Sequence, residues 1–85
     1  MYTISNSNKK TERKLEEYIL QRQDIPAKLD RLKEDPRKEC GAHPLKGPLK
    51  GKWAAWLGSN IRIVYVIDEF NKKIIIVAIG THKVY

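Results

Sequence analysis

The sequence IRIVYVI, at residues 61–67, decides which fold this chain can adopt. All of its residues except Arg62 are β-branched or aromatic, and such a run predicts a strand that is buried on both faces. An arginine in a buried strand must be paired or must reach an open side of the sheet, because an unpaired buried charge is very costly. Arg62 is therefore the first candidate for a functional residue.

Two neighbouring apolar runs extend this strand into a sheet. Residues 53–57 form the strand before it and residues 73–79 the strand after it, and the strand itself is expected to span residues 60–67. Residues 58–59 and 68–72 lie between these runs and are typical of turns. Strands that follow one another through short turns are expected to be antiparallel neighbours.

The N-terminal half of the chain predicts a short strand followed by two helices. Residues 2–4 can form the strand, and the Ser and Asn residues at 5–8 can cap a first helix over residues 9–22. Asp24 is predicted to cap a second helix, which Pro36 ends. Apolar residues recur at helical spacing on both helices: Leu15, Tyr18 and Ile19 on the first, and Ile25, Leu29 and Leu32 on the second.

Together these elements predict a single α+β domain that spans residues 1–85. The short first strand and a hairpin of two helices would pack on an antiparallel sheet of about four strands. With 85 residues the chain can build one such core but not two, so a functional site must lie on the surface or in a groove. Residues 35–51 combine Pro and Gly with Lys and Arg, which predicts a long basic loop of the kind that is usually functional or disordered.

The charge of the chain favours an anionic partner. Its 17 Lys and Arg residues against 10 Asp and Glu give a formal net charge of +7, which indicates nucleic acid first and otherwise a lysine-rich surface. Cys40 is the only cysteine, so no internal disulfide can form. His43 and His82 lack the spacing of metal ligands, and no segment approaches the ~20 apolar residues of a membrane span. We expect a cytoplasmic protein without a metal or another cofactor.

Four short motifs follow one another along the chain: HPLKG at residues 43–47, GKW at 51–53, IRIVY at 61–65 and GTH at 80–82. In this order they resemble the motifs of the RelE/ParE toxin superfamily, most closely those of its YafQ and YoeB branch. A single piece such as His-Pro-Leu is weak, but the ordered set covers nearly the whole chain and is fairly specific. The resemblance implies the same strand, helical hairpin and antiparallel sheet that the residue pattern predicts.

The resemblance also implies a function, that of a ribosome-dependent mRNA endoribonuclease, the toxin of a type II toxin–antitoxin system. Metal-free RNA cleavage uses the adjacent 2′-hydroxyl as nucleophile. The protein then has to supply a base, an acid for the 5′-oxygen and a cation for the phosphorane. The implied partners are the ribosome, the mRNA and an antitoxin, whose acidic segment is expected to lie over the sheet and the basic loop.

The resemblance assigns catalytic roles to four residues. His43 stands where this branch carries a glutamate or histidine and is the candidate base, and His82 matches the terminal histidine and is the candidate acid. Arg62 matches the arginine of the core strand that contacts the scissile phosphate, a role that suits the fixed fork of donors on a guanidinium. Tyr85 resembles the terminal aromatic residue that packs on a base.

Each of these residues also has a purely structural interpretation. The two histidines would then be an exposed loop residue and a strand-end residue bonded to the backbone. Arg62 would form a structural ion pair with Asp68 or Glu69. Tyr85 would cover the core, because stacking on a base and packing on the sheet look alike in a sequence.

Four further residues are candidates for RNA binding: Lys46, Lys50 and Lys52 in and beside the basic loop, and Trp56 on the second strand. Trp56 is interpreted first as a core residue and second as a platform on which a base stacks. On this strand the chain departs from the family, because several relatives carry histidine or arginine where it has Ala55 and Trp56.

Two other functions stay open at this point. A noncatalytic ParE-like toxin would inhibit a protein target such as DNA gyrase, but the presence of both histidines together with Arg62 argues against it. A plain basic RNA-binding domain is disfavoured, because the two aromatic residues of the second strand are not arranged as an RNP-type surface.

Overall fold

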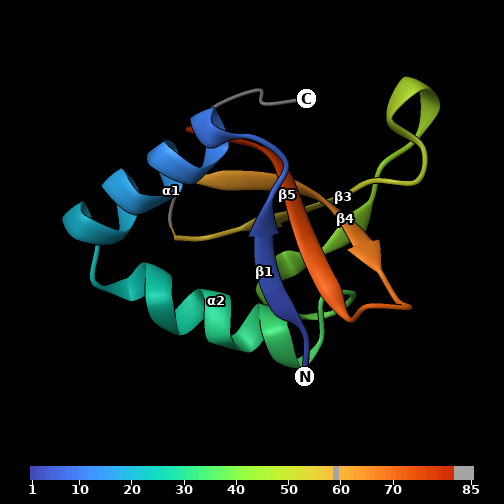
Figure 1. The fold of residues 1–85 in the computed structure, drawn as a ribbon, viewed down its shortest axis with the longest axis horizontal. Helices are drawn as coiled ribbons and strands as arrows, with labels where there is room; N and C mark the ends of the chain where they lie inside the picture. Colours follow the sequence, from blue (N-terminus) through green and yellow to red (C-terminus); the bar gives the residue numbers. More distant parts are fainter. Residues whose placement is uncertain (59, 82–85) are drawn as a thin grey trace.

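Two helices pack on one face of a five-stranded mixed sheet in the computed structural model, which describes residues 1–58 and 60–81 (Figure 1). The strands are β1 (Thr3–Asn6), β2 (His43–Pro44), β3 (Trp53–Trp56), β4 (Arg62–Asp68) and β5 (Lys73–Gly80). The helices are α1 (Lys9–Gln21) and α2 (Asp24–Glu34), and two short 3-10 helices, η1 (Glu39–Gly41) and η2 (Gly47–Leu49), lie between α2 and β3. The predicted α+β class is confirmed.

The strand order is β1-β5-β4-β3-β2, so β4 lies at the centre of the sheet. The three strands β3, β4 and β5 are antiparallel neighbours, as the sequence predicts. Two details go beyond that prediction. First, β1 is parallel to β5, because the whole intervening chain connects them and no tight turn sets their direction. Second, the predicted loop over residues 35–51 contains β2, whose two residues pair with β3 and make the sheet one strand larger than expected.

Both helices start and end for local reasons. The side chain of Asn8 caps α1 by accepting a hydrogen bond from the backbone N–H of Thr11 at 2.9 Å. The prediction that Asp24 caps α2 is wrong, because Asp24 is already the first helical residue and its carboxylate instead lies 3.4 Å from the guanidinium of Arg22. The helix α2 ends at Glu34, before the proline at position 36, as expected. No helix in the described part of the chain is long and apolar enough to cross a membrane.

A mostly aliphatic core fills the space between the helices and the sheet. Tyr65 is fully buried at its centre, and its hydroxyl donates a hydrogen bond to the carbonyl oxygen of Pro36 at 2.6 Å. The predicted helix stripes face this core, with Tyr18 and Ile19 at its edge. The buried cluster consists of Leu15, Ile25, Leu29, Leu32, Ala55, Leu57, Ile61, Ile63, Tyr65, Ile74, Ile76 and Ile79.

A β-bulge keeps the apolar side chains of β5 on the core side. Val64 pairs with Ala78 and Tyr65 pairs with Ile76, so Val77 has no partner on β4. One extra residue shifts the alternation of side chains by one position. Because of this shift both Ile76 and Ile79 reach the helix-covered core, although they are three residues apart.

The opposite face of the sheet carries a different set of residues. Residues that pair in register across a sheet point to the same side. One row consists of His43, Ala54, Val64 and Ala78, and the next of Trp56, Arg62 and Gly80. None of them belongs to the core cluster between the sheet and the helices, although Ala54 and Val64 are buried. We call this side, defined by these two rows, the second face.

The turn after β4 is held by a cluster of charged and polar groups around Glu69. Its carboxylate accepts hydrogen bonds from the Tyr2 hydroxyl at 2.7 and 2.8 Å and from Arg37 Nη2 at 2.9 Å, and it also pairs with Lys72. The bond from Lys72, followed by those from Tyr2 and Arg37, lowers the pKa of Glu69 to about 2. Glu69 thus ties the N-terminus and the segment after α2 to the turn between β4 and β5.

Candidate functional site

Arg62 and Trp56 form the centre of the candidate site on the second face. The two residues are partners in the register of β3 and β4, and the guanidinium carbon of Arg62 lies 4.0 Å from the centroid of the indole ring. At this distance the cation and the ring form a cation–π contact. Such a contact engages the flat face of the guanidinium and restricts the plane in which its N–H donors lie.

The structural alternative for Arg62, an ion pair with Asp68 or Glu69, is wrong. Arg62 and Asp68 occupy opposite ends of β4, whose seven residues span roughly 20 Å at ~3.3 Å per residue. The carboxylate of Asp68 accepts hydrogen bonds from Asn71, and that of Glu69 is engaged by the cluster described above. The first interpretation of Trp56 as a core residue is also wrong, because its side chain is 36% exposed and lies outside the core cluster.

His43 lies on the edge strand β2, on the same face as Trp56. It pairs with Ala54, two residues before Trp56 on β3, and its side chain is exposed. The Nδ1 atom of its ring lies 3.2 Å from the carbonyl oxygen of Gly41. In the tautomer that donates a proton to this carbonyl, Nε2 carries the lone pair and can accept a proton from a ligand.

Gly41 connects the histidine to the indole, and sequence reasoning missed it. A Cβ atom at this position would lie 3.2 Å from Cδ1 of Trp56, so the absence of a side chain allows the indole to pack against the backbone here. Its φ of 66° also favours glycine. Nothing distinguishes Gly41 from the other loop glycines in the sequence, because its role depends on a residue of another strand.

The predicted RNA-binding lysines lie on a hairpin that projects from the sheet between β2 and β3 (Figure 1, green to yellow). A hydrogen bond of 2.9 Å from the N–H of Leu45 to the carbonyl of Lys52 closes this hairpin, and η2 forms its tip. Lys46 and Lys50 are exposed on it, and Lys52 is half-buried at its base. The lysine hairpin therefore adjoins the Trp53 end of β3, whereas Arg62 pairs with Trp56 at the other end of that strand.

The remaining sequence-predicted residues contribute less to the described geometry. His82 and Tyr85 lie outside the described residues, so their roles stay predictions. Ala55 faces the core, where it is 1% exposed, and so takes no part in the site. Among residues 1–58 and 60–81 no three His, Cys, Asp or Glu side chains lie close enough together to hold a metal ion.

No protein-family model matches the chain, and no curated protein sequence matches it. Several solved structures, in contrast, match the chain. A YoeB/ParE toxin from Agrobacterium tumefaciens matches with a TM-score of 0.69 at 18% identity, over 96% of this chain and 99% of that one. The YoeB–YefM complex from Staphylococcus aureus contains a chain that matches with a TM-score of 0.71 at 17% identity, over 96% and 98%.

A third match is to the toxin–antitoxin complex RelBE2 from Mycobacterium tuberculosis. Its TM-score is 0.64 at 19% identity, over 95% of this chain and 98% of that one. All three matches extend over nearly the full length of both chains, so they show a shared fold.

Proposed function

The chain has the fold of the RelE/ParE toxin superfamily, and we propose that it is the toxin of a type II toxin–antitoxin pair that cleaves mRNA on the ribosome. The observation that carries this proposal is the arrangement of His43, Trp56 and Arg62 on three adjacent strands of one sheet face. A base and a cation are two of the three groups that metal-free RNA cleavage requires on the protein side, the third being an acid, and the aromatic ring can position the cation and hold a nucleobase.

His43 is the proposed general base. Its Nδ1 is held by the carbonyl oxygen of Gly41, which orients the ring and leaves Nε2 as the acceptor. The Nε2 atom would take the proton of the 2′-hydroxyl while the 2′-oxygen attacks the neighbouring phosphorus atom. Because the side chain is exposed, a ribose can approach it without a rearrangement of the sheet.

Arg62 is the proposed cation. The phosphorane carries more negative charge on its oxygens than the ground-state phosphate does, so a guanidinium beside it lowers the barrier. The contact with Trp56 restricts where the guanidinium can lie, and a positioned charge needs little reorganisation during the reaction. Trp56 would also provide an aromatic surface for a base next to the scissile bond.

The departing 5′-oxygen needs a proton, and His82 is proposed to give it. The 2′-oxygen then forms the new bond to phosphorus, the bond to the 5′-oxygen breaks, and the products are a 2′,3′-cyclic phosphate and a free 5′-hydroxyl. Tyr85 is proposed to pack on a base. These two roles rest on the GTH motif and the terminal tyrosine of the sequence.

The proposed protein partner is an antitoxin with an acidic segment. Two of the matching structures are complexes, YoeB–YefM and the toxin–antitoxin complex RelBE2, which supports a partner of this kind. The segment would lie over the second face and the lysine hairpin, where it would neutralise cations and displace RNA. The ribosome and mRNA would be the partners of the released toxin.

The test is single-turnover cleavage of mRNA on programmed ribosomes, with the ends of the products mapped. The purified chain should cut within the ribosome-bound mRNA and leave 2′,3′-cyclic phosphate ends. A chain that arrests growth but leaves the mRNA intact would contradict the nuclease. Inhibition of DNA gyrase by the same preparation would then favour the ParE-like alternative.

A further inference from the structure

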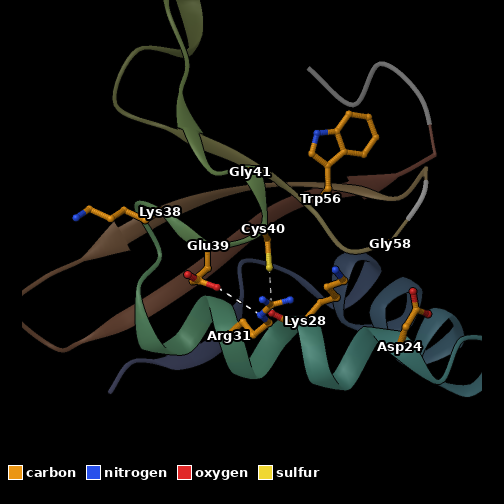
Figure 2. Close-up of a pocket in the computed structure, with 9 residues that line it drawn as sticks. All are labelled: Asp24, Lys28, Arg31, Lys38, Glu39, Cys40, Gly41, Trp56 and Gly58. Carbon is orange, nitrogen blue, oxygen red and sulfur yellow. Dashed lines mark hydrogen bonds and ion pairs between the residues drawn. The ribbon is translucent and has the colours of Figure 1, made fainter.

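A second concave region lies between α2, η1 and the end of β3, and it shares only Gly41 and Trp56 with the candidate site (Figure 2). It is an open groove of about 590 Å³. Its lining residues are Asp24, Lys28, Arg31, Lys38, Glu39, Cys40, Gly41, Trp56 and Gly58. We call it the α2 groove.

The charges of the α2 groove do not cancel locally. Both carboxylates have an arginine partner: Asp24 lies 3.4 Å from Arg22, and Glu39 lies 3.4 Å from Arg31. Within residues 1–58 and 60–81, no carboxylate oxygen lies within 4.0 Å of the ammonium groups of Lys28 or Lys38. The lining therefore carries two cations without a carboxylate partner among these residues: Lys28 in the groove, and Lys38 at its outer end, where Figure 2 shows its side chain directed away from Trp56.

The thiol of Cys40 forms part of the groove wall and, in its neutral form, adds no negative charge to it. Its Sγ donates a hydrogen bond to the carbonyl oxygen of Lys28 at 3.2 Å, and Figure 2 shows it directed from η1 towards α2. Burial raises the pKa of Cys40, which favours the neutral thiol over an anion that would repel phosphate.

Trp56 links the α2 groove to the candidate site. The indole lines the groove, and it is also the ring against which Arg62 lies at 4.0 Å. Gly41 is shared in the same way, because it lines the groove and its carbonyl oxygen holds His43. A strand whose scissile phosphate lies at Arg62 can thus continue past Trp56 into the groove without crossing the core.

We propose that the α2 groove binds the single-stranded RNA that adjoins the cleaved nucleotide, with Lys28 and Lys38 as phosphate ligands. This inference rests on the proposed nuclease function and extends its substrate site. A cationic groove that begins at an aromatic side chain is typical of proteins that bind single-stranded nucleic acid. An amphipathic peptide helix would instead need a continuous apolar wall, and the walls here are mostly charged.

The test is binding of a fluorescent single-stranded RNA of ten nucleotides, 2′-O-methylated so that it cannot be cleaved, to the isolated chain. Lys28→Gln and Lys38→Gln should each weaken binding several-fold and lower the slope of log affinity against log salt by about 0.7. Lys9→Gln is the matched control, because it removes the same charge from an exposed residue of α1 outside the groove. It should change the affinity by less than roughly a factor of two, since distant surface charges are screened.

Two checks keep the interpretation unambiguous. Circular dichroism tests the fold of each variant, and the exposed Lys38 is the safer of the two substitutions. Addition of the RNA to the isotope-labelled wild type should shift the backbone amide signals of Lys28, Lys38 and Cys40. The proposal is overturned if Lys9→Gln weakens RNA binding as much as the groove variants do.

The proposal is also overturned if the double variant Lys28→Gln/Lys38→Gln binds RNA as wild type does. The same holds if this variant loses affinity for an acidic peptide but not for RNA. Cleavage on programmed ribosomes is measured separately. A groove variant that binds RNA and cuts mRNA like wild type would refute the groove and leave the nuclease intact. Loss of RNA binding in the groove variants of a chain that never cuts mRNA would support the groove and refute the nuclease.

Discussion

The two ends of β4 carry charges that are used in different ways. At the Asp68 end, Glu69 is engaged by the hydroxyl of Tyr2 and the guanidinium of Arg37 from other segments and by Lys72 of its own turn, so its charge is neutralised within the molecule. At the other end, Arg62 lies against the exposed indole of Trp56, and the exposed His43 lies two strands away. Arg62 is the first residue of β4 and Glu69 lies in the turn directly after it, so the same strand carries both surroundings at its two ends.

The comparison indicates how structural and functional charges can be distinguished in this fold. A charge that holds the fold is surrounded by partners that satisfy its hydrogen-bonding capacity, as Glu69 is. Arg62 is instead positioned by an aromatic ring, and its proposed role is to stabilise charge on a phosphate. Substitutions at the two ends should therefore separate stability from activity.

The largest effect is expected at the Arg62 end. Arg62→Ala should slow single-turnover mRNA cleavage by roughly 10²-fold or more, because it removes charge stabilisation that is strongest in the transition state. The thermal midpoint should change little. Glu69→Gln is the matched control and should show the reverse, with a lower midpoint and normal cleavage. Equal losses of activity in both variants would remove the distinction between the two ends.

The next effect concerns the base. His43→Ala should slow cleavage by about 10²-fold, the lower end of what a general base contributes, because Arg62 still stabilises the phosphorane. Since His43 is exposed, folding should be unaffected. Single-turnover rates and thermal melts measure both quantities. Cleavage at the wild-type rate would leave His43 as an ordinary surface residue of β2.

A smaller effect is expected from Gly41→Ala, which pushes a Cβ atom towards Trp56 and so disturbs the ring that holds Arg62. We expect roughly a tenfold loss, within the ~10² that a 1 Å displacement can cost. Gly47→Ala is the control, because Gly47 has a φ of 67° but no atom within 4 Å of its added Cβ. In a Trp53→Phe background the fluorescence of Trp56 should change in the first variant only.

A substitution at Tyr65, in the middle of β4, should lower the stability of the fold and leave the cleavage activity unchanged. Tyr65→Phe removes the hydroxyl that donates to Pro36 at 2.6 Å and leaves that carbonyl oxygen without this bond. The free energy of unfolding should fall by about 1–3 kcal/mol. Denaturant unfolding measures the loss, and ribosomal cleavage should be unchanged. A stability equal to that of wild type would mean that another donor replaces the hydroxyl.

The smallest effect is the dependence of stability on pH at the Glu69 end. The pKa of Glu69 is lowered from 4.5 to about 2 in the folded chain, so its contribution is complete above pH 4.5 and is lost as the pH falls towards 2. Because Glu69 is exposed, solvent screening keeps this contribution small. Thermal melts of Glu69→Gln over this window should show a weaker dependence on pH than wild type, whereas those of Arg62→Ala should follow wild type.

Much of the fold follows from local patterns in the sequence. The β-branched run at residues 61–67 became the central strand, and the apolar residues at helical spacing became the core stripes of α1 and α2. These patterns are informative because a side chain's direction repeats every 2 residues in a strand and every 3.6 in a helix. The sequence also identified Arg62 as a candidate functional residue, because it is the one charged residue within the apolar run at residues 61–67.

Other features depend on contacts between distant segments and have no local signal. The cap at Asp24 was predicted wrongly because α2 starts one residue earlier than the residue type indicates. Trp56 was assigned to the core because an aromatic residue in a strand is usually buried, whereas the register of β3 against β4 turns it to the second face.

The sequence by itself determined the class of the fold, the order of its main elements and the candidate residues for the proposed RNA chemistry. The tertiary structure decided which of them meet. It placed Trp56 on Arg62, Gly41 between the indole and His43, and Lys28 of α2 in one groove with Trp56. The physical reason is that strand register, the bulge at Val77 and the path of the loop before β2 are set by packing of the whole chain. Periodicity within one segment carries no information about them.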